Sequence, residues 1–431
     1  MIVDLLKNNR ERIISIFYIL MPLAFFCSVR IFNFIIFSSA GLTLIYLFID
    51  FKLVKERNRK AILLLLIPFL LILYTLIQDI FHNDAAGGWY FFETYLPLGF
   101  FPLMIAVIGI TDQQIRLTKA SFFTGCIIAA LLCLGFAFWK NITDHDRIVH
   151  NWSFAETMKF YEDHPIGAIN WGFFLYMEFA NAVHFHPTYL SIFFITGIIF
   201  GLSFLERSRR INLLLITGIS LLTIEVFLLS SKISLIILLI IFALAAIRII
   251  YRATRHTRYV VIATIAAITI ALAVSSPVAF YRIEAIIKDL QSSNSNADMA
   301  SSNLHRLQLW KNAVELFKER PLTGWGLSGA EKALQAATHQ TGSQRFNTHN
   351  QYLMLLISGG LLGIIFFLAA YSTYIISSIR AADYIYTVFL ITILLGLLTE
   401  NLLSRHAGVV LYSFFNALFF IHLHNRKNEK I

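Results

Sequence analysis

Two residues in the second half of the sequence, Arg306 and His349, have side chains that could carry out chemistry on an anionic group. A guanidinium group is planar and always charged, and it can bind phosphate oxygens through two parallel hydrogen bonds. An imidazole can take up or release a proton near neutral pH and can therefore act as a general base. Taken singly, an arginine on a polar helix is more often a solvated charge, and a histidine at a helix start is more often a cap. The sequence around each residue is therefore needed to choose between these interpretations.

Arg306 lies in a segment that reads as a polar helix. Asn303 can cap a helix that runs to about Glu319, just before Arg320-Pro321. Its apolar positions recur at three- and four-residue steps and form one stripe: Leu307, Trp310, Val314 and Phe317. The helix is too polar to cross a membrane, so we expect it to lie against the membrane surface or against other helices.

Two further segments follow this helix. Residues 321–326 read Pro-Leu-Thr-Gly-Trp-Gly, and the two glycines permit tight turns and close approach of backbone to a ligand. Residues 348–352 read Thr-His-Asn-Gln-Tyr and open the next apolar run. We therefore expect His349 at a membrane surface, where the headgroup of a lipid-linked substrate would lie.

The composition sets the class of protein. The chain has 431 residues, of which 58% are hydrophobic, 15% aromatic and only 14% charged. Soluble domains average about 25% charged residues. This composition excludes a soluble globular enzyme and a disordered chain, and it indicates an all-α polytopic membrane protein.

Apolar runs long enough for membrane helices, which need about 20 residues, recur along the chain. We predict about twelve transmembrane helices near residues 12–28, 31–49, 61–77, 95–110, 120–138, 187–204, 211–229, 233–250, 259–276, 351–376, 384–400 and 408–423. The runs are too long and unbroken for barrel strands. We expect five segments: helices 1–5 in 1–138, a loop in 139–186, helices 6–9 in 187–276, a large and partly helical loop in 277–350, and helices 10–12 with a tail in 351–431.

The basic residues indicate the orientation. Most of the 35 Lys and Arg residues fall in alternate short loops, as the positive-inside rule expects. We therefore expect both termini to be cytoplasmic and both long loops to face outward. The first apolar run lacks a small-residue cleavage pattern, so we expect it to remain in the protein. The net charge of +10 is then a topology signal with a contribution from anionic membrane lipid, and we expect no nucleic-acid partner.

Several other polar residues are weaker candidates. Glu225 lies within a predicted span, where a carboxylate is costly. It precedes Lys232 by seven residues, so the two share a helix face, and a structural ion pair is as good an interpretation as catalysis. Glu400 and Arg405 could pair to hold the last helices. Trp310 and Trp325 belong either to an interfacial aromatic belt or to an outward site that uses flat rings.

The motifs together resemble a known family. Arg306-x-x-x-Trp310, then Arg320-Pro321-Leu322-x-Gly324-x-Gly326, then His349-Asn350-x-Tyr352-Leu353 are similar in type and order to motifs of the O-antigen ligase and polymerase superfamily. Further matching segments are His186–Ser191, Gly359–Gly363 and Glu400-Asn401 with Arg405.

The resemblance implies a membrane glycosyltransferase of lipopolysaccharide biosynthesis in the bacterial inner membrane, with a periplasmic active site, no metal and no cofactor. Such enzymes move a glycan from undecaprenyl diphosphate to an acceptor. In ligases the acceptor is a sugar of the lipid A core, and in polymerases it is another carrier-linked repeat unit. The single large late loop favours the ligase.

The resemblance also implies roles for individual residues. Arg306 would bind the diphosphate, and His349 would act as the general base or orient the acceptor. Members of the family often carry a second arginine where this chain reads Ser231-Lys232; lysine keeps the charge but loses the bidentate geometry. Lys232 could bind the diphosphate as a point charge or, equally, anchor its helix end at the membrane interface. The expected acceptor or supporting residues are His186, Asn350, Trp310, Trp325, Glu225, Glu400 and Arg405.

A function from another class remains open. Twelve helices with both ends inside are also a common layout of transporters, in which charged residues within spans mark a substrate path. Against this function, no repeat relates the two halves and no matched pair of broken helices is visible. A 74-residue outward loop (277–350) with its own helix suits an enzyme better than a gate.

Overall fold

The computed structural model describes residues 9–27, 29–49, 59–82, 84–144, 170–205, 209–229, 231–252, 302–338 and 347–428. These residues form helices and their connections, with no β-strand among them, as the apolar runs predicted. Two compact units emerge: residues 1–118 with 296–431, and residues 119–295. Helices far apart in the chain pack into the first unit, and the five segments expected from the sequence stay a prediction.

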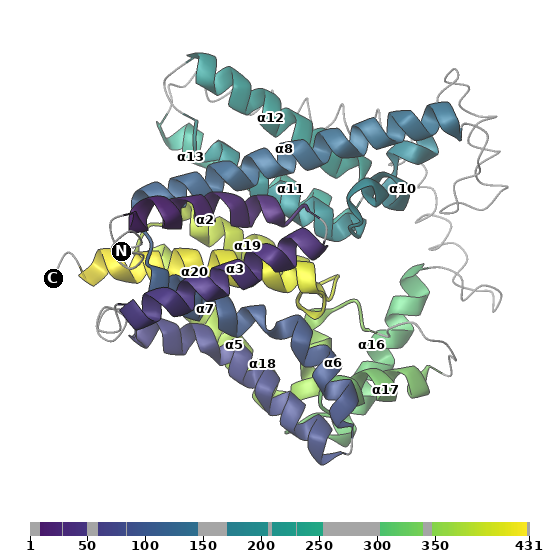
Figure 1. The fold of residues 1–431 in the computed structure, drawn as a ribbon. Coiled ribbons are helices and arrows are strands. Elements are labelled where there is room, and N and C mark those ends of the chain that lie inside the picture. Colours follow the sequence, from purple (N-terminus) through teal and green to yellow (C-terminus); the bar gives the residue numbers. More distant parts are fainter. Residues whose placement is uncertain are drawn as a thin grey trace. The chain divides into compact units, whose positions relative to one another are not determined.

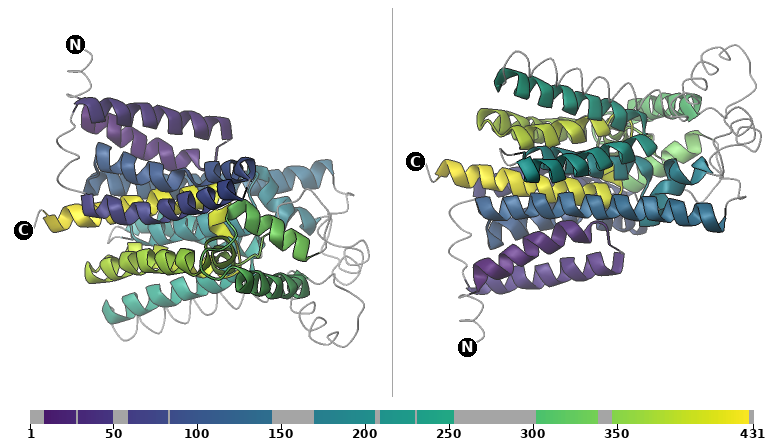
Figure 2. Two further views of the ribbon diagram at one scale, coloured as in Figure 1. Left: turned by 90° about the horizontal axis from the view of Figure 1, so that it is seen from below. Right: turned by 90° about the horizontal axis from the view of Figure 1, so that it is seen from above.

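The first unit contains most of the helices. They are α2 (Arg10–Ala24), α3 (Val29–Ile49), α5 (Arg59–Phe81), α6 (Ala85–Tyr95), α7 (Pro97–Ile108), the start of α8 (Asp112–Thr143), α16 (Ser302–Glu319), α17 (Leu327–Ala337), α18 (Gln351–Arg380), α19 (Tyr384–Gly396), the short 3-10 helix η3 (Leu402–Ser404) and α20 (His406–Asn428). Helices α16 and α17 lie at one end of this unit, and the start of α2 and the end of α20 lie at the other (Figures 1 and 2).

The long helices of the first unit are joined by apolar packing and by buried tyrosine hydroxyls. Helix α20 is buried along most of its length and packs on α7, α5 and α19, while α18 packs on α5. The Tyr374 hydroxyl on α18 donates to the Leu64 carbonyl of α5 at 2.8 Å, and the Tyr386 hydroxyl on α19 donates to Asn416 Oδ1 of α20 at 2.6 Å. Each hydroxyl thus has a partner inside an otherwise apolar bundle, where an unpaired one would be costly.

Helix α18 is interrupted at Gly360, whose backbone angles are φ 62° and ψ −160°. The turn that follows α16 supplies the missing hydrogen bonds. The Trp325 N–H donates to the Ile357 carbonyl at 2.8 Å, and the Leu361 N–H donates to the Pro321 carbonyl at 2.8 Å. Irregular backbone inside a membrane protein must be satisfied by other protein groups, and here one broken segment satisfies another.

The second unit consists of the rest of α8 and the helices η1 (Trp171–Phe174), α10 (Tyr176–Ala180), η2 (Asn181–Val183), α11 (Pro187–Leu202), α12 (Arg209–Leu228) and α13 (Lys232–Arg252). Helix α11 is apolar and almost entirely buried, and it packs on α12 and α13. A helix that is apolar on every side is typical of the middle of a bundle.

Six helices among the described residues are long and apolar enough to cross a membrane, or seven if the bent pair Tyr176–Val183 and Pro187–Leu202 forms one span. Every predicted run except 259–276 overlaps one of the helices named above, and 259–276 lies outside the described residues. The membrane class is therefore supported, whereas the count of twelve spans and the placement of the two long loops stay predictions.

Candidate functional site

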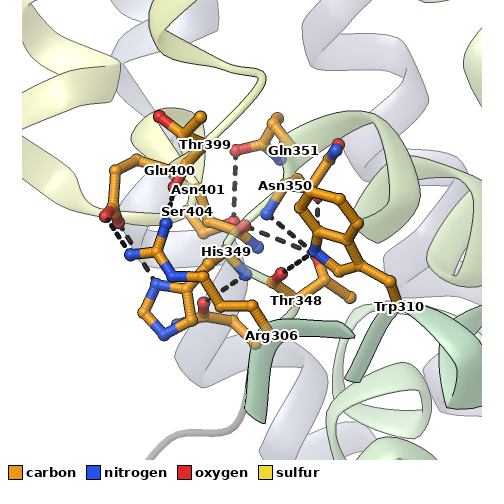
Figure 3. Close-up of polar contacts among 11 residues, drawn as sticks. Arg306, Trp310, Thr348, His349, Asn350, Gln351, Thr399, Glu400, Asn401 and Ser404 are labelled. Atoms are coloured by element: carbon orange, nitrogen blue, oxygen red, sulfur yellow. Dashed lines mark hydrogen bonds and ion pairs between the residues drawn. The ribbon is translucent and has the colours of Figure 1, made fainter. Parts of the chain in front are cut away.

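Residues from three of the sequence motifs meet in one cluster of polar contacts beside α16 (Figure 3). Arg306 comes from the first turns of α16, His349 precedes α18, and Glu400 lies in the connection between α19 and α20. Three segments far apart in the sequence thus place a cation, an imidazole and a carboxylate side by side.

Arg306 is held by two acceptors from the α19–α20 connection. Its Nη2 donates to Glu400 Oε1 at 3.1 Å, and its Nη1 donates to the Thr399 carbonyl at 3.2 Å. A guanidinium has five N–H donors, so three of them have no partner within the described ranges. The side chain is 30% exposed. Arg306 is therefore fixed in place and still able to bind an oxyanion.

His349 adopts a left-handed backbone conformation with φ 48°, which is uncommon for any residue with a side chain. The Asn347 side chain accepts a hydrogen bond from the His349 N–H at 3.0 Å and supports this bend. His349 Nδ1 lies 3.4 Å from Glu400 Oε2. An ionised carboxylate can only accept, so Nδ1 carries a proton in this contact. In a neutral imidazole Nε2 is then left as the basic atom.

Glu400 joins Arg306 and His349. Its side chain is only 9% exposed, and its two oxygens contact Arg306 and His349 respectively. A buried carboxylate needs paired charge and hydrogen bonds, which these two residues provide. The pair expected between Glu400 and Arg405 is not the arrangement found, because Glu400 is directed to Arg306 and His349 while Arg405 is exposed.

The segment that bears His349 is fixed on both sides. Trp310 Nε1 donates to the Thr348 carbonyl at 2.8 Å, which ties α16 to this segment. The Asn350 side chain caps α18 by accepting from the N–H groups of Tyr352 and Leu353 at 3.0 and 3.2 Å. This is the N-cap arrangement that satisfies free N–H groups at a helix start. Asn350 and Trp310, expected as supporting residues, therefore position the loop.

Gln351 links the start of α18 to the connection that carries Glu400. Its N–H donates to the Leu397 carbonyl at 2.9 Å, and its side-chain oxygen accepts from the Leu403 N–H at 3.0 Å and lies 3.4 Å from Ser404 Oγ. The two loops that present His349 and Glu400 are thus one hydrogen-bonded assembly.

The glycine turn is placed differently from the expectation. Gly324, Gly326 and Gly360 all have positive φ, and a Cβ on any of them would collide with protein atoms. Gly324 faces the backbone of α18, and Gly326 faces the Asp79 carboxylate. The glycines allow backbone to approach other parts of this protein, and no ligand is needed to explain them.

Trp325 serves packing at this turn. Its Nε1 donates to the Leu316 carbonyl at 2.9 Å, and the Arg320 guanidinium lies 4.1 Å from its ring centroid. Trp325 and Trp310 both pack against the buried cluster of α16, α17 and α18. Their rings therefore belong to the support of the site.

The sequence reasoning missed Asp79. This residue lies two positions after the predicted span 61–77, and its carboxylate accepts from the N–H groups of residues 327–329 at the start of α17. Helix α17 itself was also missed, although Leu327, Ala330 and Leu334 have helical spacing and are buried. The signal for Asp79 was a carboxylate at the edge of an apolar run, but nothing local indicated its partner.

Three predicted residues belong to the second unit. Lys232 is exposed at the first position of α13. Glu225 is fully buried in α12, and neither of its carboxyl oxygens has a hydrogen-bond partner among the described residues, so the proposed ion pair with Lys232 is not formed. His186 precedes α11 and packs edge-on against the rings of Tyr176 and Tyr189. Their roles in the site stay predictions.

No group of three or more His, Cys, Asp or Glu side chains in the described ranges is arranged to hold a metal ion. His145, His150 and His164, in the first long loop, lie outside those ranges.

Comparison with known protein families matches part of the chain. The profile of a family described as O-antigen ligase matches residues 217–368. The matched part includes Lys232, Arg306 and His349, whereas His186 and Glu400 lie outside it. No curated protein matches the chain in sequence.

Proposed function

Because residues 217–368 carry the O-antigen ligase domain, which confirms the resemblance seen in the motifs, we propose that this protein is an O-antigen ligase-type glycosyltransferase. In this proposal it moves a glycan from undecaprenyl diphosphate to a sugar of the lipid A core on the periplasmic face of the inner membrane. The observation that carries the proposal is the Arg306–Glu400–His349 cluster, in which an anion-binding group and a base are held by one carboxylate.

Arg306 is suited to the leaving group. The bond between the anomeric carbon and the diphosphate oxygen breaks during transfer, and negative charge accumulates on the diphosphate. The three N–H donors of Arg306 that lack a partner among the described residues can bind two phosphate oxygens without breaking the contacts to Glu400 and Thr399. Binding that strengthens as charge develops lowers the barrier to reaction.

His349 is suited to the acceptor. In the proposed step an acceptor hydroxyl oxygen forms a bond to the anomeric carbon, and its proton passes to His349 Nε2. The electron pair of the broken bond leaves with the diphosphate. This is a single displacement, so the configuration at the anomeric carbon is inverted, and a product that retained the donor's configuration would refute the mechanism.

Glu400 supports both roles. The contact at Nδ1 selects the tautomer with a basic Nε2, and the carboxylate stabilises the imidazolium that forms when the proton is taken. The same carboxylate fixes the direction of Arg306. Lys232 is proposed as a diphosphate ligand on the resemblance alone; it would act as a point charge, because lysine lacks the bidentate geometry of arginine.

The position of the cluster supports an outward-facing site. It lies with α16 at the end of the first unit opposite to the start of α2 and the end of α20 (Figure 1). If the two termini are cytoplasmic, as the basic loops predict, this end of the unit faces the periplasm, where lipid-linked glycans are the donors in the family that the chain resembles.

The experiment is to delete the gene and examine the lipopolysaccharide together with the carrier-linked glycan pool. Long glycans accumulating on undecaprenyl diphosphate, with bare lipid A core, support the ligase. Core that bears a single repeat unit indicates a polymerase instead. An unchanged glycan profile would refute both and favour a transporter.

Complementation with variants tests the site. Arg306→Ala and His349→Ala are expected to abolish transfer while the amount of protein in the membrane stays unchanged. Lys311→Ala is the matched control, because Lys311 is an exposed cation on the same helix, and it should restore transfer. Lys232→Ala should weaken transfer, and Lys232→Arg should preserve or raise it. Wild-type transfer by Arg306→Ala would refute the proposed mechanism.

A further inference from the structure

Asp79 is a fully buried carboxylate near the end of α5, and it binds the first turn of another helix. Its Oδ2 accepts from the N–H groups of Leu327 and Ser328 at 3.0 and 3.1 Å, and its Oδ1 accepts from the Gly329 N–H at 3.1 Å. These are the N–H groups at the start of α17 that no carbonyl of that helix can satisfy.

The contact is strong for a physical reason. Burying a carboxylate is costly unless it is paired, and the start of a helix offers both free donors and the positive end of the helix dipole. The backbone leaves room for this carboxylate because position 326 is glycine; a Cβ there would collide with Asp79 Oδ1. Asp79 therefore fixes both the position and the direction of α17.

Helix α17 in turn supports α16, which bears Arg306. One buried cluster joins α16, α17 and the start of α18: Leu309, Ala313, Leu316, Ala330, Leu334, Met354 and Ile357. Closely packed side chains transmit a displacement because the interior leaves little free volume. A shift of α17 would therefore move α16 and the guanidinium at its start.

From this chain of contacts we infer that Asp79 is a positioning residue of the transfer site, which acts through α17 and α16 to set the position of Arg306. The inference rests on the proposed function, because it assumes that Arg306 binds the donor. It concerns a residue 227 positions before Arg306 in the sequence and outside the domain match.

The test is a double-mutant cycle with purified protein in proteoliposomes, with undecaprenyl diphosphate-linked glycan as donor and lipid A core as acceptor. Asp79→Asn keeps the shape of the side chain but turns one acceptor oxygen into a donor that faces an N–H group. Displacements of about 1 Å can slow an enzyme by roughly 100-fold. We expect kcat/KM for the donor to fall by about 10- to 100-fold, with the donor KM raised and the acceptor KM nearly unchanged.

The second arm of the cycle separates positioning from general destabilisation. In the Arg306→Lys background, which keeps a positive charge, Asp79→Asn should lower kcat/KM by less than about twofold, because the group that Asp79 positions has already been altered. The same fold-loss in both backgrounds would overturn the inference. If Arg306→Lys and Arg306→Ala alone leave the rate unchanged, the proposed role of Arg306 has failed, whatever Asp79 does.

Two further measurements keep the test decisive. Gly326→Ala displaces the same contact without altering Asp79. If Asp79→Asn protein does not accumulate, Gly326→Ala takes its place in the cycle and should give the same fall in kcat/KM. If Arg306→Lys is inactive, the rate of thiol labelling of Arg306→Cys is measured with Cys27 replaced by Ala. Asp79→Asn should change that rate at least threefold, whereas the control Glu315→Gln, an exposed acid on α16, should not. An unchanged labelling rate with Asp79→Asn would refute the inference.

Discussion

Replacing Glu400 by Gln is the change that most directly separates the contact of Glu400 with His349 from its contact with Arg306. Glutamine has the same shape, but it presents one acceptor oxygen and one NH2 donor in place of two acceptors. Arg306 can only donate. The amide oxygen should therefore turn toward Arg306, which carries the full charge and makes the shorter contact of 3.1 Å. The NH2 group then faces His349 Nδ1.

This arrangement forces the imidazole into the wrong tautomer. Nδ1 must accept from the amide, so the proton moves to Nε2, and Nε2 is no longer a base. A hydrogen bond to a charged group contributes about 1.5–3 kcal/mol, and the 9% exposure of Glu400 leaves little water to replace it. At about 1.4 kcal/mol for each tenfold change, transfer should slow roughly 10- to 150-fold. The loss should be in kcat, with the donor KM nearly unchanged.

The assay is glycan transfer in proteoliposomes at saturating and at limiting donor concentration. Glu400→Asp keeps the charge, but its side chain is one methylene group shorter, so the carboxylate lies farther from Arg306 and His349. We expect an intermediate rate. The control is Glu319→Gln, an exposed acid at the end of α16, which should leave the rate at the wild-type value. A wild-type kcat for Glu400→Gln, or a loss confined to the donor KM, would refute the assignment of Glu400 to His349.

Three other changes test the supports of the site. Trp310→Phe keeps the ring but loses the hydrogen bond to the Thr348 carbonyl; it should lower stability by about 1 kcal/mol and transfer by less than tenfold, measured by thermal unfolding and by the transfer assay. Gly360→Ala forces a side chain into a conformation and a space that only glycine fits, so it should lower stability by at least about 2 kcal/mol and reduce the amount of folded protein. Partial burial raises the pKa of Asp84, but the hydrogen bond and charge of Lys332 outweigh it and hold that pKa below its ordinary value. The stabilisation from this pair is thus fully present above about pH 4 and is lost as pH falls through the lowered pKa; Lys332→Ala should abolish this part of the acid sensitivity of unfolding.

The local features of α16 were predictable, but its buried face was not. The Asn303 cap and the Arg320-Pro321 pair predicted a helix to about Glu319. The helix found is Ser302–Glu319, so its end was predicted correctly, whereas Asn303 lies inside the first turn and is not the cap. Of the predicted apolar stripe, Trp310 and Phe317 pack against the buried cluster, whereas Leu307 and Val314 are 55% and 41% exposed. The face that packs is Leu309, Ala313 and Leu316. Ala313 is only weakly apolar, so the pattern does not mark it as a packing position, although it is fully buried.

The turn at residues 321–326 shows a second limit of prediction from the sequence. The sequence predicted a turn-rich segment at residues 321–326 whose glycines let the backbone come close to a ligand, and the turn is found. In place of a ligand, the structure shows the interrupted backbone of α18 and the Asp79 carboxylate close to these glycines. A glycine in a turn indicates that another group comes close to the backbone. Which group that is depends on the distant segment that the fold brings to that point.

The same reasoning explains why the acid residues were harder to assign than the basic ones. The roles predicted for Arg306 and His349 rest on their own chemistry and on motifs nearby, whereas the role of a carboxylate here is defined by its partners. Asp79 and its first bonded N–H group are 248 residues apart, and Glu400 and Arg306 are 94 residues apart. A pattern of neighbours can show that a buried carboxylate needs a partner, but only the packing of helices selects it. Substitutions at these two acids therefore test the fold and the chemistry together, in a way that substitutions at Arg306 or His349 alone cannot.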